Sequence, residues 1–425
     1  YSTYGILPRG WGKCVTGDSL IFTDQGIKEM GEFFDYDQDG NEKWKELKIN
    51  VLNRNGDLEY SSMGLYNGKQ KTKKIKTNEG YEIEGTLNHP ILVMGEDGTI
   101  DFKRLEDISV GEFAVISRNN SVWGNNTSLV YDLADWVYSV SKQKSSHLNI
   151  RELPKTLDKD IALVFGYLIG DGCLTKNDRV GFTNKDPEIL DNIFRIFADK
   201  FNTSWKKVKA TGIDFYFNDV YLRKYLDING LKQTDAFGKE IPRCIMESTE
   251  ENMAYFLRGL FDTDGTAEKH RISLCTVSKK MAKQVQIALL NFGIISSLTY
   301  RTSKKGFFHY LVQIYGENIS LFNRKIGFGC TYKKKQAEST EKIIRNTNKN
   351  IIPNQKNKVT NMYHEIKKYN TYLNDKVYHV ISGNNELTYA KLHEILGLNN
   401  IKESSQYSHF SDLEKQNYFF SEISG

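Results

Sequence analysis

The chain has 425 residues, of which 26% are charged and 39% hydrophobic, and its formal net charge is +5. This length is sufficient for two or three domains, each with its own core. No apolar run approaches the roughly 18 residues of a membrane helix, and residues 1–13 lack the apolar region of a signal peptide. We therefore expect neither a membrane protein nor a membrane partner.

The five cysteines are widely spaced, and no CxxC pair occurs among them. They are Cys14, Cys173, Cys244, Cys275 and Cys330. This pattern predicts neither a zinc site nor a disulfide framework. We expect an intracellular, reducing setting, such as the cytoplasm of a prokaryote or of a phage-infected cell.

The first element in chain order is a short glycine-rich segment at residues 9–13, RGWGK. It looks like the end of a phosphate-binding P-loop, but the first glycine of the pattern would fall at Leu7, and Cys14 replaces the usual Ser or Thr. The segment is therefore a poor nucleotide-binding site by itself. It fits the first part of a P-loop whose sequence is interrupted, directly after Lys13, by an inserted element. We treat residues 1–13 as a host flank and predict a P-loop ATPase host of the packaging or terminase type. In that host, Ser or Thr should follow Lys13.

Residues 14–118 show short apolar runs separated by turn residues, which predicts an all-β module. CVTGDS begins at Cys14, and TLNH follows about 70 residues later, at residues 86–89. This pair of motifs resembles the N-terminal part of the Hint domain, the splicing domain of inteins. The resemblance implies self-processing at the Lys13–Cys14 peptide bond.

The chemistry of the three motif residues fits that implication. The thiol of Cys14 is the best side-chain nucleophile near neutral pH, and it can attack the carbonyl of Lys13 to form a thioester. His89 can carry the proton to the leaving nitrogen. The hydroxyl and backbone N–H of Thr86 are candidates to polarise the carbonyl. These steps need no cofactor.

Residues 119–152 are polar and are expected to form a linker with some helix around 129–141. Two related motifs then occur 93 residues apart, VFGYLIGDG at 164–172 and LRGLFDTDG at 257–265. Each has a small residue at every fourth position, which places these residues on one face of a helix. Packing of the two faces would bring Asp171 and Asp264 together. Two adjacent carboxylates are unfavourable unless a cation lies between them.

The motif pair resembles the LAGLIDADG homing endonucleases of the two-motif, single-chain type, over residues 153–335. The resemblance implies a pseudo-twofold αββαββα repeat that cuts double-stranded DNA, here the allele of the host gene that lacks the insertion. It also implies that Asp171 and Asp264, with the backbone carbonyls of Gly170 and Thr263, bind Mg²⁺ or Mn²⁺. Lys239, in the stretch GKEIP, would lie near the cut, although a solvent-facing loop lysine is an equal alternative.

The expected repeat has two similar sets of elements. In the first, strands are expected at 179–183 and 214–218 and helices at 187–201 and 220–228. In the second, strands are expected at 270–276, 297–302 and 307–314 and helices at 279–292 and 318–326. In this family the strands lie along the DNA major groove. Candidate DNA-binding residues are Lys206, Lys207, Lys209, Arg271, Arg301, Lys304 and Lys305.

The residues after the repeat are rich in positive charge, because 331–370 contains ten Lys or Arg and three Glu. Such a block suits a polyanion, and a solvated linker is the alternative. Residues 336–416 are expected to form a small helical accessory region, with helices at 359–369 and 387–396. The second helix could begin a helix-turn-helix DNA clamp, or the helices could be purely structural.

The last residues, 417–425, read as a strand that returns to the Hint domain. Complete inteins continue with a further strand block and end in His-Asn, and this sequence contains neither. We therefore expect a C-terminal intein fragment as a partner. A split system and a truncated product both remain open.

The combined prediction is a multidomain chain: an all-β Hint domain, an α+β pseudo-twofold LAGLIDADG endonuclease and a helical accessory region. Its predicted function is that of an intein that carries a homing endonuclease. The alternative is a freestanding site-specific endonuclease whose splicing-inactive Hint domain serves DNA binding. ATP hydrolysis is expected of the host and not of this chain.

Overall fold

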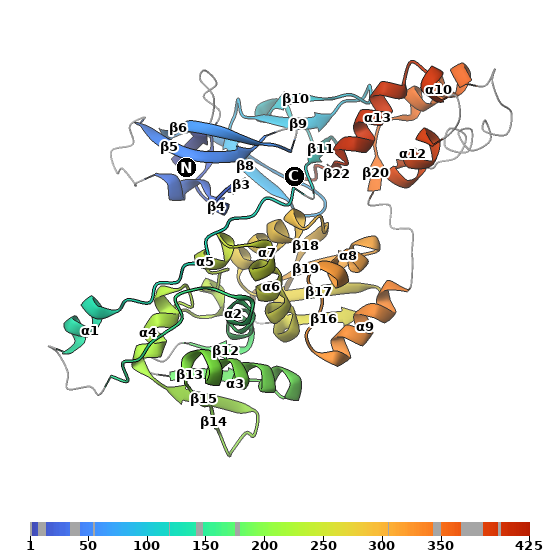
Figure 1. Cartoon of the computed structure of the whole chain (residues 1–425). Coiled ribbons are helices and arrows are strands. Elements are labelled where there is room, and N and C mark those ends of the chain that lie inside the picture. The colour runs from blue at the N-terminus through green and yellow to red at the C-terminus, as the bar shows by residue number, and fades with distance from the viewer. Residues whose placement is uncertain are drawn as a thin grey trace. The chain divides into compact units, whose positions relative to one another are not determined.

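The computed structural model describes residues 2–6, 14–34, 43–53, 56–118, 120–141, 148–174, 179–304, 306–342, 350–366, 386–397 and 401–425. The chain divides into two compact units (Figure 1). The first unit comprises Tyr1–Ser19, Glu29–Asn120 and Asn346–Gly425, and the second comprises Leu20–Lys28 and Ser121–Arg345. The P-loop-like residues 7–13 and the candidate Lys305 lie outside the described residues.

Antiparallel strands make up most of the first unit. They are β1 (Ser2–Ile6), β2 (Val15–Thr16), β5 (Lys43–Leu52), β6 (Leu58–Lys69), β7 (Thr72–Lys76), β8 (Glu82–Thr86), β9 (Pro90–Met94), β10 (Ile100–Arg104), β11 (Phe113–Ile116) and β22 (Phe419–Glu422). Six of them follow the order β5-β6-β1-β2-β8-β7, and the other four form a sheet in the order β10-β9-β11-β22. Two 3-10 turns, η1 (Met30–Phe33) and η2 (Leu105–Asp107), connect strands. The expected antiparallel sheets are present, and the Hint fold itself stays a prediction.

The hairpin of β9 and β10 illustrates how the sequence sets these strands. The carboxylate of Asp97 accepts hydrogen bonds from the N–H and the hydroxyl of Thr99, at 3.0 and 2.7 Å. Gly98 adopts φ +75°, which favours glycine. The turn pairs Leu92 with Phe102 and so fixes which side chains of the two strands share a face.

The described residues after 350 add three helices and a small sheet to the first unit. They are α10 (Lys356–Ile366), α12 (Tyr389–Leu396), α13 (Tyr407–Gln416), the 3-10 turn η5 (Ile401–Glu403), and the paired strands β20 (Ile351–Ile352) and β21 (Leu387–Thr388). Val359, Leu392 and Phe410 are fully buried in their shared core. The helix expected at 387–396 begins two residues later, because 387–388 pair with β20 and the hydroxyl of Thr388 caps α12. The DNA clamp and the purely structural role both stay predictions for this region.

The second unit contains the same order of elements twice. The first repeat is α2 (Lys159–Asp171), β12 (Gly172–Cys173), β13 (Arg179–Thr183), α3 (Pro187–Phe201), β14 (Lys206–Lys207), β15 (Asp214–Asn218) and α4 (Val220–Ile228). The second repeat is α6 (Glu250–Asp264), β16 (Gly265–Glu268), β17 (Arg271–Thr276), α7 (Lys279–Asn291), β18 (Ser296–Thr302), β19 (Phe308–Tyr315) and α8 (Glu317–Lys325). The two sheets have equivalent strand orders, β12-β13-β15-β14 and β16-β17-β19-β18. The predicted αββαββα repeat is confirmed.

Further elements of this unit lie outside the repeats. The hairpin β3 (Leu20–Thr23) and β4 (Gly26–Glu29) precedes them, and α1 (Ala134–Ser141) follows it along the chain. The 3-10 turn η3 (Ala236–Gly238) and the short helix α5 (Arg243–Met246) connect the two repeats. Lys28 at the end of the hairpin forms an ion pair with Glu247 at 2.6 Å. Residues 20–28 therefore group with the second unit, although the sequence placed them in the all-β module.

In the segment expected to be a linker at 119–152, the described residues 121–141 and 148–152 belong to the second unit. The side-chain amide of Asn291 accepts from Val122 N at 3.1 Å and donates to Val122 O at 2.6 Å. Asn229 makes the equivalent pair of hydrogen bonds with Val130, both at 2.9 Å. Asn229 follows the first repeat and Asn291 belongs to the second. The segment that we call the strap, residues 121–141 and 148–157, is therefore hydrogen-bonded to both.

The start of the basic block is a helix and not the solvated linker that was the alternative prediction for it. Residues 331–341 form α9 (Thr331–Glu341), which runs across the domain boundary predicted at 335/336. The second unit continues to Arg345. Lys333, one of the block's basic residues, has only 6% of its surface exposed. Within the described residues, no helix is both long enough and apolar enough to span a membrane.

Candidate functional site

The motif helices α2 and α6 cross with their backbones in contact (Figure 1). A Cβ on Gly166 would lie 2.2 Å from Phe256 O, and a Cβ on Gly259 would lie 2.3 Å from Leu163 O. Both positions therefore require glycine. One turn farther on, a Cβ on Gly170 would lie 1.9 Å from the hydroxyl of Thr263. The small residues spaced four apart thus explain why the two helix ends come together.

Asp171 and Asp264 are the last residues of the two motif helices. The side-chain amide of Asn184 donates to the carboxylate of Asp171 at 2.6 Å. Burial raises the pKa of Asp171, against the hydrogen bond from Asn184. Burial also raises the pKa of Asp264 to about 6; Lys239 opposes this shift and the charge of Asp171 adds to it. The two predicted acids therefore face a common, partly buried site, as the motif pair predicted.

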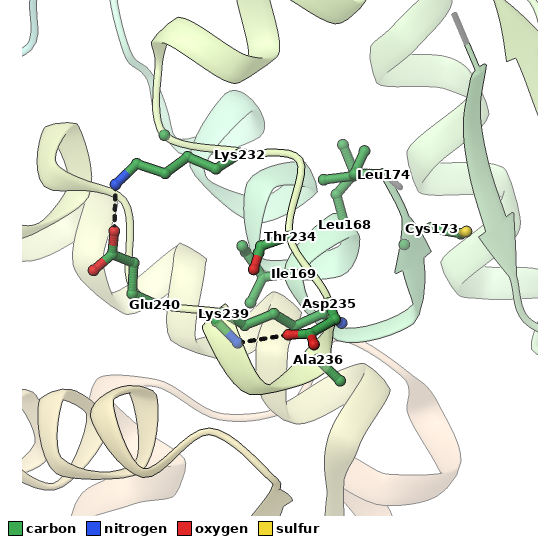
Figure 2. Close-up of a pocket in the computed structure, with 13 residues that line it drawn as sticks. Leu168, Ile169, Cys173, Leu174, Lys232, Thr234, Asp235, Ala236, Lys239 and Glu240 are labelled. Carbon is green, nitrogen blue, oxygen red and sulfur yellow. Dashed lines mark hydrogen bonds and ion pairs between the residues drawn. The ribbon is translucent and has the colours of Figure 1, made fainter. Parts of the chain in front are cut away.

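Lys239 belongs to this site and is not a solvent-facing loop residue. Its ammonium donates to Gly170 O, at the end of α2, at 2.8 Å. Burial lowers its pKa, and the charges of Asp264 and Asp171 oppose that shift. Figure 2 shows Lys239 in the wall of a pocket beside Leu168 and Ile169 of α2.

The backbone around Lys239 is held by the second repeat. The hydroxyl of Ser278, which caps α7, donates to Lys239 O at 2.6 Å. The side chain of Gln284, in the same helix, accepts from Ile241 N at 2.8 Å. The side chain of Lys239 thus contacts the first repeat while its backbone is fixed to the second.

Lys333 is a second buried lysine at the site, and sequence reasoning did not single it out. Its ammonium donates to Asp262 O at 2.5 Å, Gly265 O at 2.7 Å and Phe261 O at 3.2 Å, all at the end of α6. Burial lowers its pKa, and the charges of Asp171 and Asp264 act in the opposite direction. Lys239 and Lys333, which we call the site lysines, lie 94 residues apart, close to the 93-residue offset of the motifs. That spacing was the signal that could have identified Lys333.

The donor set of the site fits a hard divalent cation only in part. The charge of Asp171 raises the pKa of Asp264, and Mg²⁺ or Mn²⁺ bound between the two carboxylates would stabilise their ionised forms. Among the described residues, no cluster of three or more His, Cys, Asp or Glu could hold a metal alone. The carbonyl of Gly170 accepts from Lys239, and that of Thr263 lies 3.5 Å from the ammonium of Lys333. The ligand role of these two carbonyls stays a prediction.

In each sheet of the second unit, side chains alternate between a face buried in the core and the opposite face, which we call the open face because it carries the exposed residues of the strands. Val180 and Phe182 of β13 are fully buried, as are Ile272 and Leu274 of β17. The residues that alternate with them, including Arg179, therefore lie on the open face. The guanidinium of Arg179 lies 3.9 Å from the ring centroid of Tyr216, which neighbours buried Phe215 and Phe217 on β15. Arg179 and Tyr216 were not among the predicted DNA-binding residues.

The predicted basic residues fall into different positions. Lys206 pairs with Tyr216 and shares the open face, whereas Lys207 pairs with core-facing Phe215 and lies on the other face. Arg271 and Arg301 alternate with core-facing residues and lie on the open face of the second sheet. Arg271 also pairs with Glu268 at 2.7 Å. Lys209 and Lys304 lie in the turns between strands.

A second candidate site lies in the first unit around Cys14, which is fully buried. The hydroxyl of Thr86 accepts from Cys14 N at 3.2 Å, and Thr86 N donates to Cys14 O at 2.9 Å. A Cβ on Gly85 would lie 2.7 Å from Cys14 O and 3.3 Å from the Cβ of His89, so Gly85 separates these two residues. The three predicted residues are thus brought together. Thr86 contacts the nitrogen of the Lys13–Cys14 bond, and contact with its carbonyl stays a prediction.

Comparison with protein families supports the interpretation of the second unit. Residues 251–327, the second motif helix with most of its repeat, match the family model for a LAGLIDADG-like domain. The chain therefore contains a LAGLIDADG-like domain, of the kind that the paired helices and acids define.

Curated relatives share most of this chain but only part of their own length. The chain is 29% identical over 355 residues to a replication factor C small subunit of Methanocaldococcus jannaschii, covering 81% of this chain and 17% of that protein. It is 28% identical over 357 residues to the Thermococcus kodakarensis protein of the same name, covering 81% and 36%. It is 26% identical over 343 residues to the DNA gyrase A protein of Mycobacterium kansasii, covering 76% and 56%. These names do not support the prediction of a packaging-type P-loop host.

Two solved structures are also similar to part of the chain. A crystal structure of I-DmoI in complex with DNA and Mn has a TM-score of 0.32 and 18% identity, covering 40% of this chain and 96% of that one. The N-terminal LAGLIDADG domain of DUF199/WhiA has a TM-score of 0.29 and 14% identity, covering 40% and 81%.

Proposed function

We propose that the second unit is a site-specific endonuclease that cuts both strands of a DNA duplex, and that the chain is an intein that carries it. The observation that supports this best is the convergence of Asp171 and Asp264 at a glycine-lined helix crossing. Each repeat contributes one acid, Asp171 or Asp264. Two equivalent acids suit a DNA duplex, which has one bond to be cut in each strand. The proposed target is the host gene without the insertion.

The residues of the site have separable tasks in this proposal. Asp171 and Asp264 are the anionic ligands for Mg²⁺ or Mn²⁺, which supplies Lewis acidity at the phosphate. Burial lowers the pKa of both site lysines, so each is a candidate to donate to, or exchange a proton with, groups at the scissile phosphate. Basic and aromatic residues on the open sheet faces would contact backbone and bases.

The chain's relation to its curated relatives supports the intein part. About four fifths of it aligns within proteins of two different names, a DNA gyrase A protein and a replication factor C small subunit. A segment shared by two differently named proteins fits an inserted element. The freestanding endonuclease with an inactive splicing domain remains the alternative.

The proposal is tested by incubating the full chain with a duplex of the uninterrupted host gene and Mg²⁺ across pH 5–8. We expect one double-strand cut that a chelator abolishes. Because the pKa of Asp264 is raised to about 6, its carboxylate is ionised and able to bind a cation above that pH. The cleavage rate should therefore fall as pH drops through about 6. A rate that persists in chelator would contradict the assignment.

Self-processing at Cys14 is the second proposed activity, supported by the contact between the Thr86 hydroxyl and Cys14 N. An added strong thiol should intercept a thioester and release residues 1–13, detected by mass spectrometry. Release should be abolished in Cys14→Ala and slowed in Thr86→Val. Cys244→Ala, which removes a thiol of the second unit, is the matched control and should behave as the parent. The absence of any released peptide would favour the alternative with an inactive splicing domain.

A further inference from the structure

The helix that carries Lys333 has an unusual start. The side chain of Cys330, at the N-cap position of α9, makes no capping hydrogen bond. Instead, carboxylates from two other helices accept hydrogen bonds from the residues at the start of α9. Asp262 of α6 accepts from Gly329 N at 2.8 Å. Glu188 of α3 accepts from the N–H of Thr331 and, at 2.6 Å, from its hydroxyl. The start of α9 is therefore tied to both repeats at once.

The position of Glu188 makes it well suited to hold this helix start. It lies in the first turn of α3, where its own N–H donates to Asp186 at 2.9 Å. Its carboxylate therefore lies near the N-termini of both α3 and α9, where helix dipoles favour negative charge. The hydrogen bonds from Thr331 lower its pKa, so it is ionised at neutral pH.

The contact with Glu188 bears directly on the site, because Lys333 follows Thr331 by two residues in the same turn of α9. The ammonium of Lys333 is fixed on the carbonyls of Asp262 and Gly265. A change in the position of the first turn of α9 would move that ammonium relative to Asp171 and Asp264. Displacements of about 1 Å at a reacting centre can reduce rates by about 100-fold.

The other site lysine is held in an equivalent way. The hydroxyl of Ser278, at the N-terminus of α7, donates to Lys239 O at 2.6 Å. The helices α3 and α7 are equivalent elements of the two repeats. Lys239 contacts α2 of the first repeat and is anchored to the second, whereas Lys333 contacts α6 of the second repeat and is anchored to the first. The position of Lys239 therefore depends on the N-terminus of α7 in the second repeat, and the position of Lys333 depends on the N-terminus of α3 in the first repeat.

We propose that Glu188 is a positioning residue for Lys333, which fixes the first turn of α9 to the first repeat and so sets the ammonium at the paired acids. The inference rests on the proposed endonuclease function for its kinetic consequence. Its structural consequence, the placement of Lys333, can be measured without cleavage.

The chain offers a matched control at the opposite end of α9. Glu341 accepts from the hydroxyl of Ser320 at 2.6 Å and from the side-chain amide of Asn323 at 2.8 Å, both in α8. Like Glu188, it is a carboxylate that accepts two hydrogen bonds that hold α9, although Glu188 is exposed and Glu341 is half-buried. It differs in lying far along the helix from Lys333 and in bonding within the second repeat only.

The kinetic test compares Glu188→Gln with Glu341→Gln in the full chain. We expect Glu188→Gln to lower kcat about tenfold or more with KM for DNA unchanged, and Glu341→Gln to leave both unchanged. Thr331→Val, which keeps the N–H but removes the hydroxyl, should cause a smaller loss of kcat. Thr331→Ser should restore the parent rate. Equal losses in Glu188→Gln and Glu341→Gln would show that α9 is merely loosened and would overturn the proposal.

The second readout needs no activity. A lysine-acylating reagent, followed by peptide mass spectrometry, reports how well each lysine is protected. Lys333 should react slowly in the parent and in Glu341→Gln, and several times faster in Glu188→Gln. An unchanged reaction rate in Glu188→Gln would overturn the proposal even if the parent cuts no DNA. A parent that cuts no DNA but shows the expected protection would reject only the endonuclease function.

Discussion

Asp264→Asn is expected to abolish DNA cleavage while leaving DNA binding intact. The substitution keeps the shape of the side chain but removes one of two anionic ligands from a buried site. Loss of several kcal/mol of transition-state stabilisation corresponds to about a 1,000-fold lower rate. The measurement is single-turnover cleavage of the uninterrupted gene, with binding followed by gel shift. Asp191→Asn, on the exposed side of α3, is the control and should cut at the parent rate.

This loss should not come from unfolding. Burial raises the pKa of Asp264 in the folded chain, so ionisation of this group disfavours the fold above pH 6. Replacing it with a neutral amide should therefore leave thermal stability at pH 8 equal to or above that of the parent. An Asp264→Asn protein that cuts at the normal rate would remove Asp264 from the proposed site.

Gly259→Ala is expected to cause the largest loss of stability in the second unit. Its new Cβ would lie 2.3 Å from Leu163 O and 3.1 Å from Tyr167 N, both backbone atoms that no rotamer change can move. The helices must separate, at a cost of about 3 kcal/mol or more, which exceeds the roughly 1 kcal/mol that alanine gains over glycine in a helix. Thermal unfolding of the full chain measures this.

Glu251→Ala, at an exposed position in the first turn of the same helix, is the control and should change the midpoint little. A Gly259→Ala midpoint equal to that of the control would mean that the helix backbones are not in close contact. The activity of Gly259→Ala should fall with its folded fraction, because Asp171 and Asp264 meet only while the helices cross.

The repeat and its paired acids could be predicted from the sequence because they depend on local patterns. A small residue at every fourth position and Asp-Gly at each helix end indicate the crossing at Gly166 and Gly259. The strand and helix ranges followed from apolar periodicity in each repeat. Lys239 was found through a resemblance to a known family rather than through its surroundings.

Lys333 could not be predicted in the same way, because its environment is made by residues distant in sequence. Its local sequence, YKKKQ, indicates a solvated charged segment. Only the folded chain shows that the carbonyls at the end of α6 accept hydrogen bonds from this ammonium and compensate for its burial. The strap was missed for the same reason, since Asn229 and Asn291 satisfy backbone groups of a polar stretch about 100 to 170 residues earlier.

The pairing of β11 with β22 has a consequence for folding during synthesis. Phe113 pairs with Glu422, so the partner of β11 emerges from the ribosome about 300 residues after it. At a synthesis rate of about 5–20 residues per second, the edge of β11 that pairs with β22 stays unpaired for roughly 15–60 s. During this time it can pair with the wrong strands. Residues 121–345 of the second unit are synthesised within that interval, after its residues 20–28, so this unit can complete its own fold first. A compact second unit shortens the flexible loop that must close before β22 can join, so its early folding should speed completion of the first unit.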